Sequence, residues 1–189
     1  MQKCPKRVNH SMSSKREWSF NDFEVKLLDD PVDLSGFKCD DDDELGLDNF
    51  LRKDAVAFYR CGLGVTHLFY LRGTKQFVGY VTLAMGAMRK NKCNAGVADY
   101  DKVNVPALFL GRLAVANGFR RAGIGVIIVK YCIDLAIVLS KSVVGCRFVT
   151  LVTKEGYRVK FYEKKCHFER VKASYLEPDC VLMRFNLYA

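Results

Sequence analysis

An arginine- and glycine-rich turn, Arg120-Arg121-Ala122-Gly123-Ile124-Gly125, is the segment best suited to bind an anion. It follows the apolar run 108–115 and precedes a second long apolar segment, 126–139. The first N–H groups of a helix lack partners within it and lie at the positive end of its dipole, so they attract phosphate. Glycine lets a bulky diphosphate approach the backbone, and the arginines add positive charge. The other interpretation is a basic turn ahead of a core helix.

Two better-known phosphate loops do not occur in the sequence. There is no G-x-G-x-x-G and no G-x-x-x-x-G-K-[S/T]. The turn therefore indicates neither a dinucleotide-binding fold nor an NTPase, but a phosphate of another kind.

The elements that must position this turn mix strands with helices. Hydrophobic periodicity predicts helices over 47–58, 123–140 and 155–165, and strands over 22–28, 67–71, 77–85, 105–115, 147–152, 167–172 and 180–187. The turn Arg72–Lys75 predicts a hairpin, residues 89–101 a loop, and the acidic run 40–44 a cap of the first helix. The fold class is therefore α+β, and 189 residues suit one domain, 19–189, after a flexible tail, 1–18.

Two further landmarks stand in order around the turn: the strand 110–115 before it and Phe161-Tyr162-Glu163 after it. With them the sequence resembles the GNAT family of acetyl-CoA-dependent N-acetyltransferases. The family signature [Gln/Arg]-x-x-Gly-x-[Gly/Ala] is matched by Arg120, Gly123 and Gly125. The resemblance runs from residue 22 to residue 187 and implies a twisted, mostly antiparallel sheet of about seven strands flanked by helices.

The resemblance also implies how acetyl-CoA binds and which residue acts. Its pantetheine arm would pair with Leu113, Ala114 and Val115, and its diphosphate would bind Arg120, Arg121, Ala122, Gly123, Ile124, Gly125 and Val126. A backbone N–H near Leu113 or Ala114 would stabilise the oxyanion. Tyr162 would be the general acid, because a phenol with a pKa of about 10 can protonate a thiolate. No metal is implied. On spacing alone, Tyr162 is equally a core aromatic of its helix.

An early segment narrows the resemblance to one branch. Phe37-Lys38-Cys39 followed by 47–55 resembles the Phe-x-Cys…Leu-Asp-x-Phe-Leu…Ala opening of the toxins that acetylate aminoacyl-tRNA. That branch also has the Gly-Arg-Leu-Ala-Val strand, here 111–115. It implies a homodimer, a tRNA substrate and a DNA-binding antitoxin as partner. The other interpretation is that these residues simply form the core of the first helix.

Charge is distributed unevenly along the chain. Residues 1–54 hold 9 Lys and Arg against 13 Asp and Glu, whereas residues 55–189 hold 21 against 8. A basic field attracts polyanions and makes binding sensitive to salt, so tRNA contact is one interpretation and a solvated basic face the other. The candidate substrate contacts are Arg89, Lys90, Lys92 and Arg158.

No general base stands out. The strand 105–115 has no Asp or Glu, and the three histidines are expected to be structural. The α-amine of an aminoacyl ester is less basic than a lysine amine, so it needs a strong base less. Two residues depart from the family pattern: His167 replaces a glycine, and Arg158 replaces a small residue.

The remaining features agree with a cytoplasmic protein. The first 18 residues lack an apolar core for a signal peptide, and the longest apolar helix, 126–139, contains Lys130 and Asp134 and is too short to span a bilayer. Eight cysteines show no Cys-x-x-Cys pair, which favours free buried thiols over a disulfide framework or a zinc site.

Three functions stay open at this point. The first is acetyl transfer to the α-amine of aminoacyl-tRNA by a toxin. The second is a GNAT acetyltransferase acting on a protein N-terminus, a lysine or a small-molecule amine. The third is a CoA-binding regulatory module without turnover.

Overall fold

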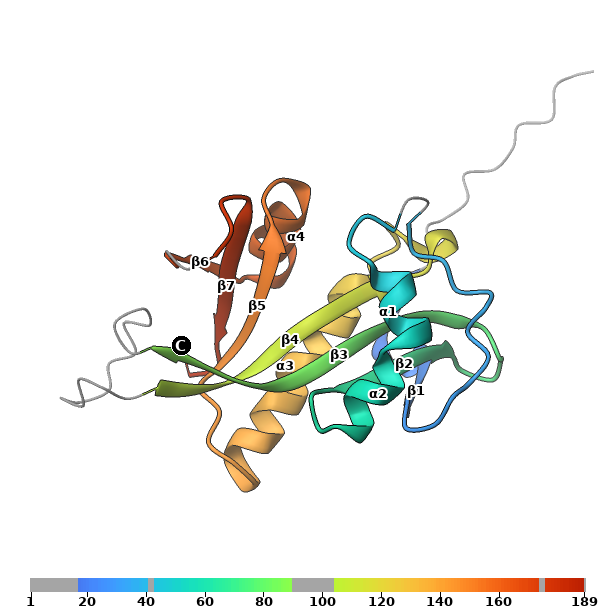
Figure 1. Ribbon diagram of the computed structural model, residues 1–189, viewed down its shortest axis with the longest axis horizontal. Helices are drawn as coiled ribbons and strands as arrows, with labels where there is room; N and C mark the ends of the chain where they lie inside the picture. The colour runs from blue at the N-terminus through green and yellow to red at the C-terminus, as the bar shows by residue number, and fades with distance from the viewer. Residues whose placement is uncertain (1–16, 41–42, 90–103, 174–175, 189) are drawn as a thin grey trace, which may run out of the picture.

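A single sheet of seven strands organises the computed structural model, which describes residues 17–40, 43–89, 104–173 and 176–188 (Figure 1). The strands are β1 (Phe23–Leu27), β2 (Val65–Leu71), β3 (Phe77–Arg89), β4 (Asn104–Val115), β5 (Phe148–Lys154), β6 (Glu169–Val171) and β7 (Cys180–Asn186). The helices are α1 (Leu47–Lys53), α2 (Ala55–Arg60), α3 (Ile124–Ser142) and α4 (Tyr157–Cys166). The strand order is β1-β2-β3-β4-β5-β7-β6.

Only the central pair of strands runs parallel. β4 and β5 are parallel, while every other neighbouring pair is antiparallel, including the predicted β2–β3 hairpin. The mixed α and β composition and the mostly antiparallel sheet are therefore confirmed.

Helices cover both faces of the sheet. In Figure 1, α1 and α2 lie in front of β2 to β4, and α3 lies behind them. Successive side chains of a strand point to opposite faces of the sheet, so each face has its own core. On one face, Tyr80 and Ala114 pack with Phe50 of α1. On the other face, Val81 and Leu113 pack with Ile128 of α3.

The sheet opens at its centre. The β4–β5 ladder consists of three pairs and ends at Phe109 and Thr150, although both strands continue beyond that point. Gly111 is the extra residue of a β-bulge, because Thr82 pairs with Arg112 and Leu83 with Leu110. A bulge bends its strand, so β4 turns away from β5 just after their last pair.

The first helix is shorter than predicted. Residues 47–58 were expected as one helix, but Asp54, with φ −111°, divides them into α1 and α2. Aspartate competes for backbone hydrogen bonds and is a poor residue for a helix interior. The acidic run does cap α1, because the Asp43 carboxylate accepts the N–H groups of Asp48 and Asn49, each at 2.9 Å.

α4 ends in a left-handed residue, His167, with φ 59° and ψ 31°. The next N–H, that of Phe168, donates to Tyr162 O at 3.0 Å, and the two rings pack with centroids 5.7 Å apart. This turn therefore fixes the end of the helix that carries Tyr162.

We expect His167→Gly to raise the free energy of unfolding by about 0.5–1 kcal/mol. Glycine relieves the strain of the left-handed conformation, and this gain exceeds the additional backbone entropy that glycine loses on folding. Urea unfolding monitored by circular dichroism measures the change. His167→Ala keeps the Cβ and is the control, which should gain nothing. A glycine variant less stable than the alanine variant would show that the turn is unstrained.

Trp18, expected within the tail, packs on Phe23 and Phe119. None of the described helices has the length and apolar character needed to cross a membrane. The six cysteines that lie in the described ranges are free thiols.

Candidate active site

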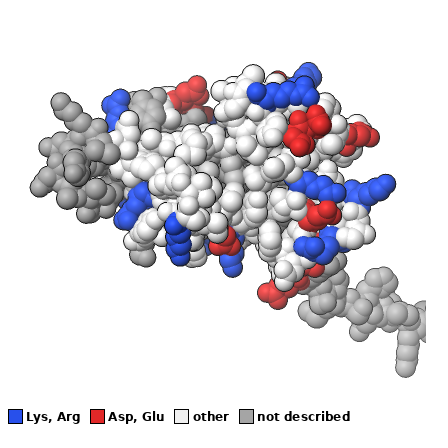
Figure 2. Space-filling view, turned by 90° about the horizontal axis from the view of Figure 1, so that it is seen from below, with Lys and Arg blue, Asp and Glu red and all other residues white. Residues whose placement is uncertain are grey.

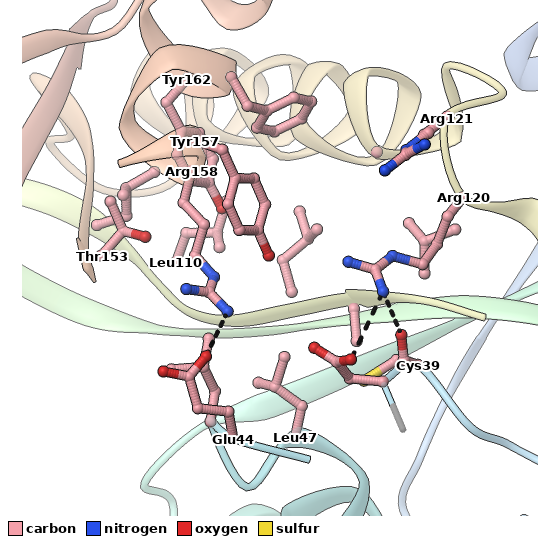
Figure 3. A pocket seen from close by; sticks show the side chains of 18 of the residues that line it. Cys39, Glu44, Leu47, Leu110, Arg120, Arg121, Thr153, Tyr157, Arg158 and Tyr162 are labelled. Atoms are coloured by element: carbon pink, nitrogen blue, oxygen red, sulfur yellow. Dashed lines mark hydrogen bonds and ion pairs between the residues drawn. The ribbon is translucent and has the colours of Figure 1, made fainter. Parts of the chain in front are cut away.

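A cavity of about 690 Å3 lies where β4 and β5 separate. Four distant parts of the chain line it: the segment before α1, the second half of β4, the turn into α3, and the end of β5 with α4. Figure 3 shows Tyr157, Arg158 and Tyr162 reaching in from α4, opposite Glu44 and Leu47. The fold thus brings the predicted strand, turn and tyrosine to one place.

Leu113 and Val115 turn their backbone groups toward this opening. The N–H of Ala116 donates to Val78 O of β3 at 2.9 Å. Peptide groups alternate in direction along a strand, so Ala114 also faces β3, while Leu113 and Val115 face the side that β5 has left. An extended ligand can therefore pair with β4 there, and of the two candidate oxyanion donors only Leu113 presents its N–H to the opening.

The turn before α3 presents a run of free N–H groups. Within the described parts of the chain, the amides of residues 121–125 donate to no acceptor. Arg121 and Gly123 have φ of 60° and 86°, and a Cβ on Gly123 would meet nothing within 4 Å. Successive amides in such a turn at a helix N-terminus form a binding site for an anion.

Contacts with the rest of the fold constrain three residues of this turn. The amide of Val126 is already bonded to Gly123 O at 3.0 Å, so it is not available to a phosphate. Ile124 buries its side chain in the core and offers only its amide. A Cβ on Gly125 would lie 3.3 Å from the ring of Phe161, so this glycine also serves close packing of α3 against α4.

The two arginines of the turn differ in their contacts. Arg120 Nη1 donates to Cys39 O at 3.2 Å and lies 3.8 Å from Asp40 Oδ1 (Figure 3). Arg121 lines the cavity and forms no ion pair with any residue that the structure describes. Arg121 is therefore the cation free to meet an anion, whereas Arg120 shares its charge with the segment before α1.

Tyr162 lies in the wall of the cavity and is 9% exposed. Its ring packs between Phe161 and Phe168, and its hydroxyl has no hydrogen-bond partner in the described part of the chain. Burial, together with nearby Cys166 and Cys132, raises the pKa of Tyr162 above its ordinary value. The phenol is therefore neutral and keeps its proton at physiological pH.

A family model agrees with this geometry. The acetyltransferase (GNAT) family model matches residues 65–168, which span β2 to α4 and include the opened strand, the turn and Tyr162. The chain belongs to the GNAT family. No curated protein matches the sequence.

Solved structures share the GNAT fold over most of the chain. AtaT complexed with acetyl-methionyl-tRNAfMet is 20% identical with a TM-score of 0.69, covering 85% of this chain and 94% of AtaT. A mutant AtaT toxin bound to the C-terminus of the antitoxin AtaR and acetyl-CoA is 22% identical with a TM-score of 0.66, covering 88% and 94%. A mutant of KacT is 18% identical with a TM-score of 0.70, covering 88% and 95%. These likenesses establish the fold.

The GNAT cavity also contains residues that the sequence did not point to. Glu44 accepts hydrogen bonds from Arg158 Nη2 at 3.2 Å and from Lys154 Nζ at 3.4 Å. These bonds, that of Arg158 first, lower the pKa of Glu44 below its usual value. No local signal reveals Glu44, because more than a hundred residues separate it from its partners. The sequence offered one indication of such a pair, which is the contrast between the acidic run 40–44 and the basic residues 55–189.

The remaining substrate-contact candidates do not meet at the cavity. Arg89 ends β3, where it pairs with Asn104, and is not among the lining residues. Lys90 and Lys92 lie outside the described residues. Arg158 alone of the four lines the site.

Proposed function

We propose that this protein transfers the acetyl group of acetyl-CoA to the α-amine of aminoacyl-tRNA. The main support for this reaction is that the opened edge of β4, the free amides of the turn and Tyr162 lie in the same cavity. Acetyl-CoA supplies the acetyl group as an activated thioester. The chain supplies the rest of the chemistry.

The residues present fit this co-substrate. Amides 121–125 and Arg121 would hold its diphosphate, and Leu113 and Val115 would pair with its pantetheine arm. The Leu113 N–H would stabilise charge on the carbonyl oxygen. Tyr162 would donate its proton to the departing sulfur.

The acceptor is assigned from what the site lacks and from the fold. β4 contains no carboxylate, and Glu44 is a weak base because two cations hold it ionised. An amine of low basicity, such as that of an aminoacyl ester, therefore suits the site. The shared fold with AtaT, whose structure contains acetyl-methionyl-tRNAfMet, supports the same choice.

The resemblance to the toxins that acetylate aminoacyl-tRNA suggests further properties. The protein would act as a toxin in the cytoplasm, as a homodimer, and would be neutralised by a DNA-binding antitoxin. The AtaT structure with its antitoxin AtaR supports the partner.

One observation favours a second acceptor class. Asp40, Asp43 and Glu44 line the cavity together with Arg120, Arg121 and Arg158, so carboxylates that could contact a cationic amine are present in the site. On the face seen in Figure 2, acidic and basic side chains lie beside one another around a wide uncharged area, so that face carries no continuous basic surface. A lysine or polyamine is therefore the alternative.

The discriminating experiment incubates purified protein and labelled acetyl-CoA with total charged tRNA, with the same tRNA after deacylation, and with RNA-free lysine peptides and polyamines. The proposal expects label only with the charged pool, and transfer that falls as salt rises. Label on the RNA-free amines alone would replace it with the second function.

The pH profile is a further prediction. A raised pKa keeps Tyr162 protonated at alkaline pH, so the rate should rise as the α-amine, with a pKa of about 8 or below, loses its proton and should then stay level to about pH 10. Initial rates over short times, before the ester hydrolyses, measure this. A fall that begins near pH 9 would mean that Tyr162 ionises with an ordinary or lowered pKa.

A further inference from the structure

Arg158 enters the cavity from the same helix face as Tyr162. The two residues are four positions apart on α4, so their side chains lie on one face, and both line the cavity. The Arg158 side chain is only 17% exposed. Its guanidinium also lies 4.8 Å from the centroid of the Tyr157 ring.

Glu44 holds this guanidinium in place from the opposite wall. One carboxylate oxygen of Glu44 accepts from Arg158 at 3.2 Å, and the other accepts from Lys154 at 3.4 Å. Figure 3 shows the Arg158 side chain running from α4 across the cavity to Glu44. The charge of Arg158 is thus fixed inside the site, beside the tyrosine proposed as acid.

Building on the proposed acetyl transfer, we propose that Arg158 is a catalytic residue that stabilises the departing thiolate, and that Glu44 is the positioning residue that holds it. As the amine nitrogen bonds to the carbonyl carbon, the carbon–sulfur bond breaks and its electron pair leaves with the sulfur. Tyr162 gives the sulfur its proton, the amine loses a proton to water, and water reprotonates Tyr162.

Tyr162 needs such help because of its burial. A thiol has a pKa of about 8.5. Burial raises the pKa of the Tyr162 phenol above its ordinary value, so the phenol is a weaker acid than the thiol that forms when its proton reaches the sulfur. A nearby cation favours the anionic forms of both groups, and Arg158 does lower the pKa of Tyr162 against the effect of burial.

The position of Arg158 is poorly suited to a tRNA phosphate. It is largely buried and already paired, whereas Lys160 of the same helix is exposed. A polyanionic backbone meets cations at the surface first. Arg158 is therefore assigned to the reacting atoms and not to the RNA.

The test measures thiol release with two acceptors, charged tRNA and an amino-acid methyl ester that carries the same α-amine without RNA. We expect Arg158→Gln to lower kcat about 10- to 100-fold with both acceptors and to change KM by less than about twofold. Arg158→Lys should keep part of the activity. Lys160→Gln, which removes an exposed cation from the same helix, should leave transfer to the methyl ester unchanged.

Glu44 is tested by coupling. Glu44→Gln should lower kcat by a smaller factor, about 3- to 10-fold, and should have no further effect in the Arg158→Gln background. Acetyl-CoA-dependent thermal stabilisation shows that each variant still folds and binds.

Two outcomes would overturn the assignment. A loss confined to KM for charged tRNA would make Arg158 a phosphate contact. A Glu44→Gln defect that persists without Arg158 would give Glu44 a role of its own. Failure of the wild-type protein to use either acceptor would instead contradict the proposed function. The variants are then assayed with the amine that the enzyme does accept.

Discussion

Replacing Tyr162 by phenylalanine is expected to lower kcat about 100- to 10,000-fold, the range typical of a lost general acid. The phenylalanine ring fills the same space between Phe161 and Phe168. The lost hydroxyl has no hydrogen-bond partner in the described chain, so stability should be nearly unchanged. Thiol release measures kcat, and thermal stabilisation by acetyl-CoA measures binding.

Tyr59→Phe removes a hydroxyl from an exposed tyrosine of α2, outside the cavity, and is the control with expected wild-type rates. Full activity in the Tyr162→Phe protein would remove this residue from the mechanism and return it to the role of a core aromatic.

The second large effect is expected at the anion-binding turn. Gly123→Ala should weaken acetyl-CoA binding about 10- to 100-fold, because φ 86° strains any residue with a Cβ, and a turn that relaxes from this conformation no longer aligns its free amides. Calorimetric titration with CoA measures the affinity.

Gly118→Ala is the control for this turn. Gly118 lies in the same connection, has no positive φ, and has open space around its Cβ position, so its replacement should leave the affinity unchanged. Equal affinity of the Gly123→Ala protein and wild type would mean that the diphosphate binds elsewhere.

Local signals in the sequence were sufficient for much of the site. The pattern of glycines before a long apolar helix located the turn. Gly123 has a positive φ and Gly125 packs closely against Phe161, so each position has a structural reason to be glycine. Alternation and the family motif placed β4 and Tyr162. A His in a glycine position pointed to strain, and His167 is left-handed.

Features made by contacts between distant residues were not predictable in this way. Arg120 was expected on a phosphate, and the fold also brings its Nη1 to Cys39 O in the segment before α1. The same segment brings Glu44 to Arg158. Only the tertiary arrangement determines these pairs, because the sequence gives charges without their neighbours.

Acetyl transfer to the α-amine of an amino acid esterified to tRNA can be detected directly on the product. Charged tRNA treated with the protein and acetyl-CoA can be digested with ribonuclease, and the released aminoacyl-adenosine analysed by mass spectrometry. We expect an acetyl group on the α-nitrogen of one or more aminoacyl-adenosines, absent with the Tyr162→Phe protein. Unmodified aminoacyl-adenosines, with acetyl groups found on lysine side chains or polyamines instead, would contradict it.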